Sequence, residues 1–157
     1  MKILTIIKVF LLVFILNTLL PAYTLTGKVV SVTDGDTIKV LTKDKTQYKI
    51  RLVGIDAPEK TQAFGKKSKK NLSKLVANRI TDIHYEKKDR YGRILGIVYI
   101  DGMDMNLRQL KDGYAWVYRR YCSRADYYKA EKYARTKKLG LWYDKNPIPP
   151  WDYRHRR

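Results

Sequence analysis

The sequence predicts an α+β fold, mainly β, in which five strands form a small barrel and about three helices pack against it. β-Branched and apolar runs, separated by short polar turns, occur in five places along the chain. A helical period replaces the two-residue alternation after the third run. About 135 residues follow the N-terminal apolar segment, a length that supports one hydrophobic core and therefore one domain.

Residues 1–22 have the layout of a secretory signal peptide. Lys2 and Lys8 precede the apolar stretch 9–16, and small residues surround the break at Pro21. This stretch is shorter than the roughly 20 residues that a membrane-spanning helix needs. We therefore expect a secreted or periplasmic protein, with an uncleaved N-terminal membrane anchor as the alternative. The domain would occupy residues 23–143, followed by a Pro-rich basic tail, 144–157.

The predicted strands are residues 25–32, 37–41, 48–55, 80–85 and 94–100. The polar stretch Thr-Asp-Gly-Asp between the first two is typical of a hairpin. In the third strand, alternation directs Ile50, Leu52 and Ile55 toward the core. Three consecutive strands of this kind predict a meander.

Three helices are expected around the barrel. The first begins near Ala63 and has a largely apolar face opposite a run of lysines (Phe64, Ser68, Leu72, Leu75 and Val76 against Lys66, Lys67, Lys69, Lys70 and Lys74). The others are 106–112, ended by Gly113, and 126–138, ended by Gly140. The last residues contain three prolines, so we expect an extended tail that packs through Trp142 and Trp151.

Charge and cysteine content narrow the class of partner and of chemistry. The chain has 33 Lys and Arg against 15 Asp and Glu, a net charge of +18. This excess favours nucleic acid, anionic lipid or acidic polysaccharide as a partner. Cys122 is the only cysteine, so an internal disulfide and a thiolate metal cluster are excluded. Two histidines in the whole chain argue against zinc.

Three carboxylates stand at strand ends or turns: Asp36, Asp56 and Glu59. Side chains at strand ends can converge above a rigid barrel, and hard cations such as Ca²⁺ take carboxylate, carbonyl and water oxygens. Two aspartates from different strands would form an open cation site. Each carboxylate also has a structural interpretation, namely hairpin turn, turn cap and helix start.

Two arginines strengthen the functional interpretation. Arg51 lies five residues before Asp56, so a bend near Gly54 is needed to bring the two side chains together. Arg93 follows a turn at the start of the last predicted strand. Guanidinium groups bind phosphate oxygens bidentately, which suits a reaction that accumulates negative charge on phosphate. The alternative is two ordinary surface arginines in a basic chain.

Five stretches in order make the chain resemble the staphylococcal (micrococcal) nuclease family: DGDT at 34–37, RLVGIDAPE at 51–59, DRYGR at 89–93, GYAWVYRRY at 113–121 and GLW at 140–142. The resemblance covers essentially everything after residue 22. It implies an OB-fold barrel with appended helices and a Ca²⁺-dependent phosphodiesterase. Such an enzyme would cut both DNA and RNA with low sequence specificity and leave 3′-phosphate ends.

The resemblance also implies the metal ligands. Matched block by block, Asp36 and Asp56 would bind Ca²⁺ through their carboxylates, and Ala57 through its backbone carbonyl oxygen. Asp34 would be a supporting carboxylate behind them. Position 57 is Thr in the founding member of the family, but a main-chain ligand does not depend on that side chain.

Catalysis and substrate binding would then fall to other residues. Glu59 would orient or deprotonate the attacking water, and Arg51 and Arg93 would hold the phosphate. The aromatic pair that packs on the nucleotide in the founding member falls here on Arg119 and Tyr121. We therefore expect the nucleic-acid-binding aromatics to be Tyr121, with Tyr91 and with Tyr118 or Trp116.

Two alternatives belong to other classes of protein. The first is a non-catalytic OB-fold that binds single-stranded nucleic acid, but such proteins usually lose the acidic ligands or the arginines, which this chain keeps. The second is a cationic envelope or lipid-binding protein anchored by residues 1–22, which would not hydrolyse anything. We expect no obligate protein partner.

Overall fold

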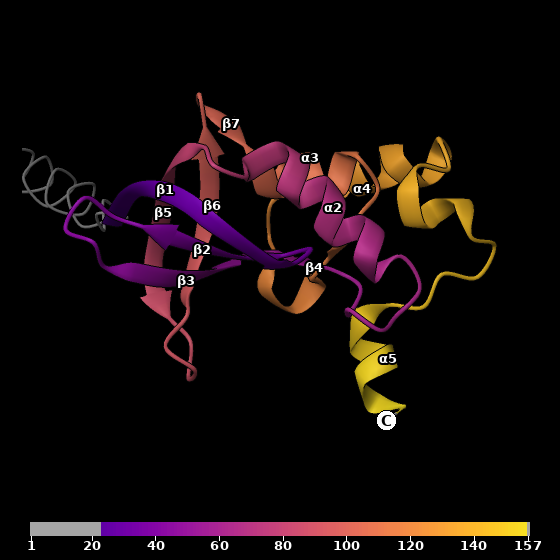
Figure 1. The fold of residues 1–157 in the computed structure, drawn as a ribbon. Coiled ribbons are helices and arrows are strands. Elements are labelled where there is room, and N and C mark those ends of the chain that lie inside the picture. Colours follow the sequence, from indigo (N-terminus) through magenta and orange to yellow (C-terminus); the bar gives the residue numbers. More distant parts are fainter. Residues whose placement is uncertain (1–22, 157) are drawn as a thin grey trace, which may run out of the picture.

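Five strands close a mixed barrel in the computed structural model, which describes residues 23–156 (Figure 1). They are β1 (Tyr23–Asp34), β2 (Thr37–Leu41), β3 (Gln47–Leu52), β5 (Ile80–Lys88) and β6 (Ile94–Ile100). The order is β3-β2-β1-β5-β6 with antiparallel neighbours, and a parallel pairing of β3 with β6 closes the barrel. A short strand, β7 (Met103–Asp104), extends the sheet beyond β6. The predicted OB-fold class is confirmed.

The barrel core follows from the two-residue alternation along the strands. Inward side chains on four strands are fully buried, among them Ile38, Ile50, Leu52, Ile83 and Val98. Leu72 and Val76 of α2 (Gly65–Val76) belong to the same cluster of buried residues, so this helix covers the barrel along its predicted apolar face. The lysines of α2 lie on its other faces.

Two further helices extend this layer: α3 (Met105–Lys111) packs against α2, and α4 (Ala125–Thr136) packs against α3. Asp104 caps the start of α3 by accepting a hydrogen bond from the backbone N–H of Leu107 at 2.8 Å. Gly113 follows α3 with φ 78°, as predicted for a glycine after a C-cap. Glu131 of α4 is also buried, which the sequence pattern did not predict. Its carboxylate accepts a hydrogen bond from the backbone N–H of Val117 at 3.0 Å.

The third predicted strand is interrupted, which corrects its expected end at residue 55. β3 ends at Leu52, and the chain turns at Gly54, where φ is 79°. It continues as β4 (Ile55–Asp56), which pairs antiparallel with β8 (Trp116–Val117) instead of with the barrel. The side chain of buried Asn106 stabilises the turn, because its Nδ2 donates to the carbonyl oxygen of Val53 at 3.0 Å. The predicted bend near Gly54 is confirmed.

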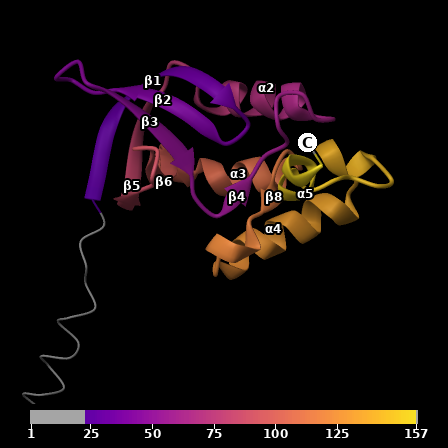
Figure 2. The same cartoon turned by 90° about the horizontal axis from the view of Figure 1, so that it is seen from below.

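The C-terminal region departs from the expected extended tail. After the 3₁₀ turn η2 (Gly140–Tyr143), the chain forms a fourth helix, α5 (Pro150–His155). Pro150 occupies the first turn, where its missing N–H costs no hydrogen bond. This region packs through Trp142 and Trp151, as expected from the sequence, and the structure shows that both pack edge-on against Trp116. Figure 2 shows α5 next to β4 and β8.

The predicted signal peptide or anchor lies outside the described residues. Within residues 23–156, no helix has the length and apolar character needed to cross a bilayer.

Candidate active site

The strand register brings the predicted carboxylates and Arg51 to one rim of the barrel. Asp36 lies in the tight turn of the β1–β2 hairpin, between the paired residues Asp34 and Thr37. Thr37 in turn pairs with Arg51 across β2 and β3. The turn packs closely on its surroundings, because a Cβ on Gly35 would lie only 1.8 Å from the Ser68 hydroxyl oxygen. Glycine is therefore required beside Asp36.

Arg51 bridges the two aspartates. Its Nη2 lies 3.1 Å from Asp36 Oδ2 and 3.0 Å from Asp56 Oδ1. Its Nη1 donates to the backbone carbonyl oxygens of Leu52 and Ile55, at 2.8 and 2.9 Å. These carbonyls flank the turn at Gly54, so the turn itself fixes the guanidinium. The side chains are almost buried, with exposed fractions of 12% for Arg51 and 2% for Asp56.

Ala57 is held against the same cluster. Its backbone N–H donates to Asp36 Oδ2 at 2.7 Å, while the Thr37 hydroxyl donates to Asp36 Oδ1 at 3.0 Å. Asp34 lies behind Asp36 and accepts a hydrogen bond from its backbone N–H at 3.2 Å. The structure thus brings together Asp34, Asp36, Asp56 and Ala57, the four residues expected around a cation.

The carboxylates form an acidic cluster with little solvent. Burial raises the pKa of Asp34 to about 7, and the negative charge of Asp36 adds to this effect. Burial also raises the pKa of Asp56, and Asp36 again adds to it, while hydrogen bonds and charge from Arg154 and Arg51 oppose the shift. The negative charges of these carboxylates repel one another, so a bound cation would stabilise their ionised forms.

The donor set fits a hard divalent cation with an open coordination sphere. Asp36 and Asp56 share one guanidinium nitrogen, so their oxygens can converge on one ion, and the backbone of Ala57 adjoins them. Residues 23–156 contain no group of three or more His, Cys, Asp or Glu side chains arranged as a metal site. An ion held here would therefore complete its coordination with backbone and water oxygens, which Ca²⁺ accepts.

Glu59 joins this cluster through a residue that the sequence did not single out. Nη1 of Arg154, in α5, lies 2.7 Å from Glu59 Oε1. Its Nη2 lies 2.7 Å from Asp56 Oδ2, so one guanidinium spans both acids. A separation of 98 residues from Asp56 left no local pattern by which sequence reasoning could find the contact.

Arg93 lies outside this contact network. Its Nε donates to Asp89 Oδ2 at 2.7 Å, and its guanidinium packs over the ring of Tyr91 at 5.6 Å. Asp89 also accepts the backbone N–H groups of Tyr91 and Arg93, which closes the turn between β5 and β6. Arg93 is thus fixed by the turn, and the structure shows no direct contact with the acidic cluster among the described residues.

The candidate stacking residues divide into two groups. Tyr118 and Tyr121 form an edge-on pair with ring centroids 4.9 Å apart, and they follow β8, in which Trp116 pairs with Asp56. The ring of Trp151 in α5 stacks on Tyr118, with centroids 5.8 Å apart and planes 4° from parallel. Tyr91 is exposed and lies separately, on the β5–β6 turn.

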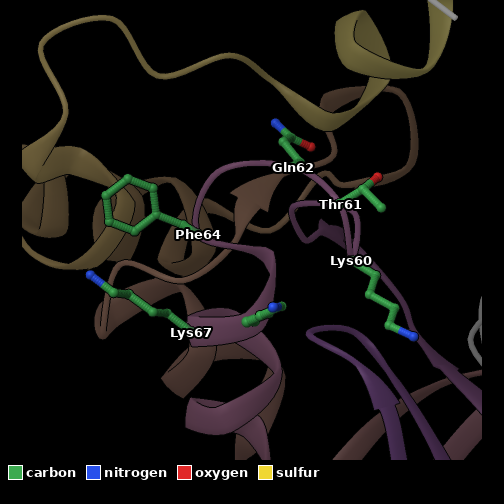
Figure 3. Close-up of a pocket in the computed structure, with 6 residues that line it drawn as sticks. Lys60, Thr61, Gln62, Phe64 and Lys67 are labelled. Carbon is green, nitrogen blue, oxygen red and sulfur yellow. The ribbon is translucent and has the colours of Figure 1, made fainter.

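A pocket of about 520 Å³ lies beside the loop that follows Glu59 in the chain (Figure 3). It is formed by the loop after Glu59 and the start of α2, with three lysines among its lining residues (Lys60, Thr61, Gln62, Phe64, Lys66 and Lys67). The pocket lining is therefore basic, and it begins at Lys60, directly after Glu59 in the chain.

The barrel and the cluster together define an OB-fold protein whose acidic, arginine-paired site is suited to phosphate esters. A family model described as staphylococcal nuclease homologue matches residues 49–144, more than half of the chain. An uncharacterized endonuclease of Escherichia coli is 47% identical over 132 residues, which cover 83% of this chain and 86% of that protein.

Two other relatives agree. An uncharacterized endonuclease of Haemophilus influenzae is 46% identical over 131 residues, which cover 83% of this chain and 74% of that protein. A micrococcal nuclease of Shigella flexneri is 40% identical over 139 residues, covering 82% and 79%. The chain belongs to the staphylococcal nuclease homologue family. It is a hydrolase of the nuclease type, and the predicted family is confirmed.

Proposed function

We propose that the protein is a secreted, Ca²⁺-dependent nuclease that hydrolyses phosphodiester bonds in DNA and RNA with low sequence specificity and leaves 3′-phosphate ends. The observation that carries the proposal is the position of Arg51, whose guanidinium lies between Asp36 and Asp56 at the barrel rim. A cationic group that can bind phosphate thus adjoins the oxygens that can bind a metal ion.

Asp36, Asp56 and the backbone carbonyl of Ala57 would hold the cation. When bound, Ca²⁺ supplies a Lewis acid that polarises a phosphate oxygen and a template that orients the substrate. Arg51 would bind the non-bridging phosphate oxygens and neutralise the charge that develops on them. The carbonyls of Leu52 and Ile55 hold its Nη1, so the guanidinium would stay at the barrel rim while Nη2 exchanged the aspartates for the phosphate.

Glu59 would position the attacking water and accept its proton. Its carboxylate is partly exposed at the edge of the cluster, where water can reach it. Arg93 would approach the phosphate from the β5–β6 turn, with Asp89 holding its Nε and leaving the end of the guanidinium to the substrate. These roles follow general acid–base and electrostatic catalysis of ester hydrolysis.

The positive surface would supply affinity without sequence preference. The net charge of +18 and the lysines around the pocket beside Glu59 favour contacts with the phosphate backbone. Tyr118 and Tyr121 would stack on bases, an interaction that every base can make. Secretion rests on the layout of residues 1–22, and N-terminal sequencing of the exported protein tests it.

The decisive experiment is digestion of DNA and RNA by the purified protein in a series of divalent cations, with end-group analysis of the fragments. We expect cleavage of both substrates with Ca²⁺, loss of cleavage on chelation, and 3′-phosphate ends. Binding of single strands without metal-dependent cleavage would contradict the proposal and indicate the non-catalytic alternative.

A further inference from the structure

The C-terminal helix α5 inserts a positive charge into the proposed active site. Arg154 Nη2 lies 2.7 Å from Asp56 Oδ2, and Nη1 lies 2.7 Å from Glu59 Oε1. Nη1 also donates to Asp56 Oδ1 at 3.3 Å. Both oxygens of Asp56 are therefore engaged by one guanidinium, and Oδ1 is shared with Arg51.

Contacts on both sides hold α5 in this place. On one side, Gln62 Nε2 donates to the backbone carbonyl oxygen of Ile148 at 2.6 Å, and the hydroxyls of Thr61 and Tyr153 lie 3.2 Å apart. Gln62 and Thr61 belong to the loop after Glu59, over which the C-terminal segment passes in Figure 3. On the other side, the ring of Trp151 stacks on that of Tyr118.

Arg154 and Trp151 of α5 each cover a different part of the proposed site. Arg154 engages Asp56 and Glu59, the proposed metal ligand and the proposed base. Trp151 covers the ring of Tyr118, one of the residues proposed to stack on a base. Arg154 engages both carboxylate oxygens of Asp56, whereas Arg51 contacts Oδ1 alone, so Arg154 is the group that a divalent ion at Oδ2 would have to displace. Docked α5 and a bound cation are therefore in competition.

We propose that α5 is a tethered inhibitor, in which Arg154 competes with a divalent cation for Asp56 and Trp151 competes with a base for Tyr118. The inference rests on the proposed function. It adds that the cation has to displace Arg154, so that docking of α5 raises the cation concentration at which the site is filled.

The ion pairs that Arg154 forms with Asp56 and Glu59 can be displaced by a bound cation. Asp56 is almost completely buried and needs a counter-charge, whereas the side chain of Arg154 is 40% exposed. Hydration of Arg154 after release compensates for part of its lost pairing, so the docked state does not lock the site. When the competent form is only partly populated, the apparent dissociation constant rises by the inverse of its population.

Calorimetric titration with Ca²⁺ alone, in the absence of nucleic acid, tests the inference without relying on activity. We expect the full-chain variant Arg154→Ala to bind Ca²⁺ about tenfold more tightly than the wild type, which corresponds to α5 being docked in about nine molecules of ten. Arg156→Ala is the matched control. It removes the same charge from the same segment, and no ion pair of Arg156 is found in the described part of the chain.

Tryptophan fluorescence of the wild-type protein gives a second readout, which does not depend on the Arg154 variant. Ca²⁺ should change the emission as Trp151 leaves Tyr118, and Trp151→Phe should abolish most of this change. Tighter binding by Arg154→Ala, with Arg156→Ala unchanged, supports the inference.

Three results would overturn the inference. Equal or weaker Ca²⁺ binding by Arg154→Ala would refute it while leaving the proposed nuclease function intact. A Ca²⁺-saturated wild type with unchanged Trp151 emission would do the same. Failure of both wild type and Arg154→Ala to bind Ca²⁺ would refute the inference together with the Ca²⁺ dependence in the proposed function.

Discussion

Arg51 Nη2 lies 3.0 Å from Asp56 Oδ1, although Arg51 precedes Asp56 by five positions along what would be a single strand. A regular strand would direct them to opposite faces. The turn at Gly54 removes this conflict, because it ends β3 and starts β4 in a new direction. The geometry of the proposed active site thus depends on one backbone feature, the turn at Gly54.

Gly54→Ala should destabilise the protein and reduce its activity. A Cβ at residue 54 would lie 3.1 Å from the ring of buried Tyr127, and the backbone has φ 79°. We expect a loss of about 1–3 kcal/mol in the free energy of unfolding, measured by urea denaturation. Gly92→Ala is the control, because it has a similar φ of 75° and no atom within 4 Å of its Cβ. Equal losses in the two variants would contradict this account.

Asn106→Ala should also destabilise the turn at Gly54, because it removes a side chain that is hydrogen-bonded to the turn. Buried Asn106 accepts from the backbone N–H of Val98 and donates to the carbonyl oxygens of Val53 and Gly96. Removal leaves these buried groups without that partner, and we expect a cost of about 2–4 kcal/mol in urea denaturation. Asn146→Ala, at an exposed turn, should cost far less. A cost below that of Asn146→Ala would show that Asn106 does not support the turn.

Arg51→Ala, Glu59→Gln and Arg93→Ala should each slow cleavage of DNA at least about a hundredfold without unfolding the protein. Each removes a group proposed to bind the phosphate or to activate water. Initial rates with plasmid DNA and Ca²⁺ measure the effect, and circular dichroism checks the fold. Arg90→Ala is the control for Arg93, because it removes the neighbouring guanidinium over Tyr91. Near-wild-type turnover by Arg93→Ala would remove Arg93 from the site.

The pair of Asp89 and Arg93 should contribute stability that depends on pH. Burial alone would raise the pKa of Asp89, but hydrogen bonds from Arg93 and Tyr91 outweigh it and hold that pKa below its ordinary value of 3.8. A lowered pKa of a carboxyl in the folded state means that its stabilisation is present above pH 3.8 and is lost as the pH falls through the folded value. The difference in free energy of unfolding between wild type and Asp89→Asn should therefore shrink below about pH 4. A difference that stays constant from neutral to acid pH would exclude this role.

Local sequence patterns predicted the barrel well. Alternation identified the buried faces of the strands, and glycine and polar residues marked the turns, including the bend at Gly54. The predicted carboxylates and Arg51 converge because strand register, which follows from alternation and short hairpins, fixes their relative positions.

There is a physical reason why the docking of α5 and the burial of Glu131 were not predicted. Arg154 reaches Asp56 only because α5 docks through contacts with the loop after Glu59 and with Tyr118, all distant in sequence. Three prolines favoured an extended tail, although Pro150 at a first turn and basic residues in the last turn are local signals of a short helix. Glu131 was missed because a search for apolar periodicity overlooks a buried acid.

A crystal structure of the protein with Ca²⁺ and a non-hydrolysable dinucleotide tests the site most directly. The account predicts one ion bound by oxygens of Asp36, Asp56 and Ala57 at about 2.3–2.6 Å. It also predicts the Arg51 guanidinium on the phosphate and Arg154 withdrawn from Asp56. An ion and a phosphate bound elsewhere, with Arg51 still paired to Asp36 and Asp56 and Arg154 still paired to Asp56, would contradict it.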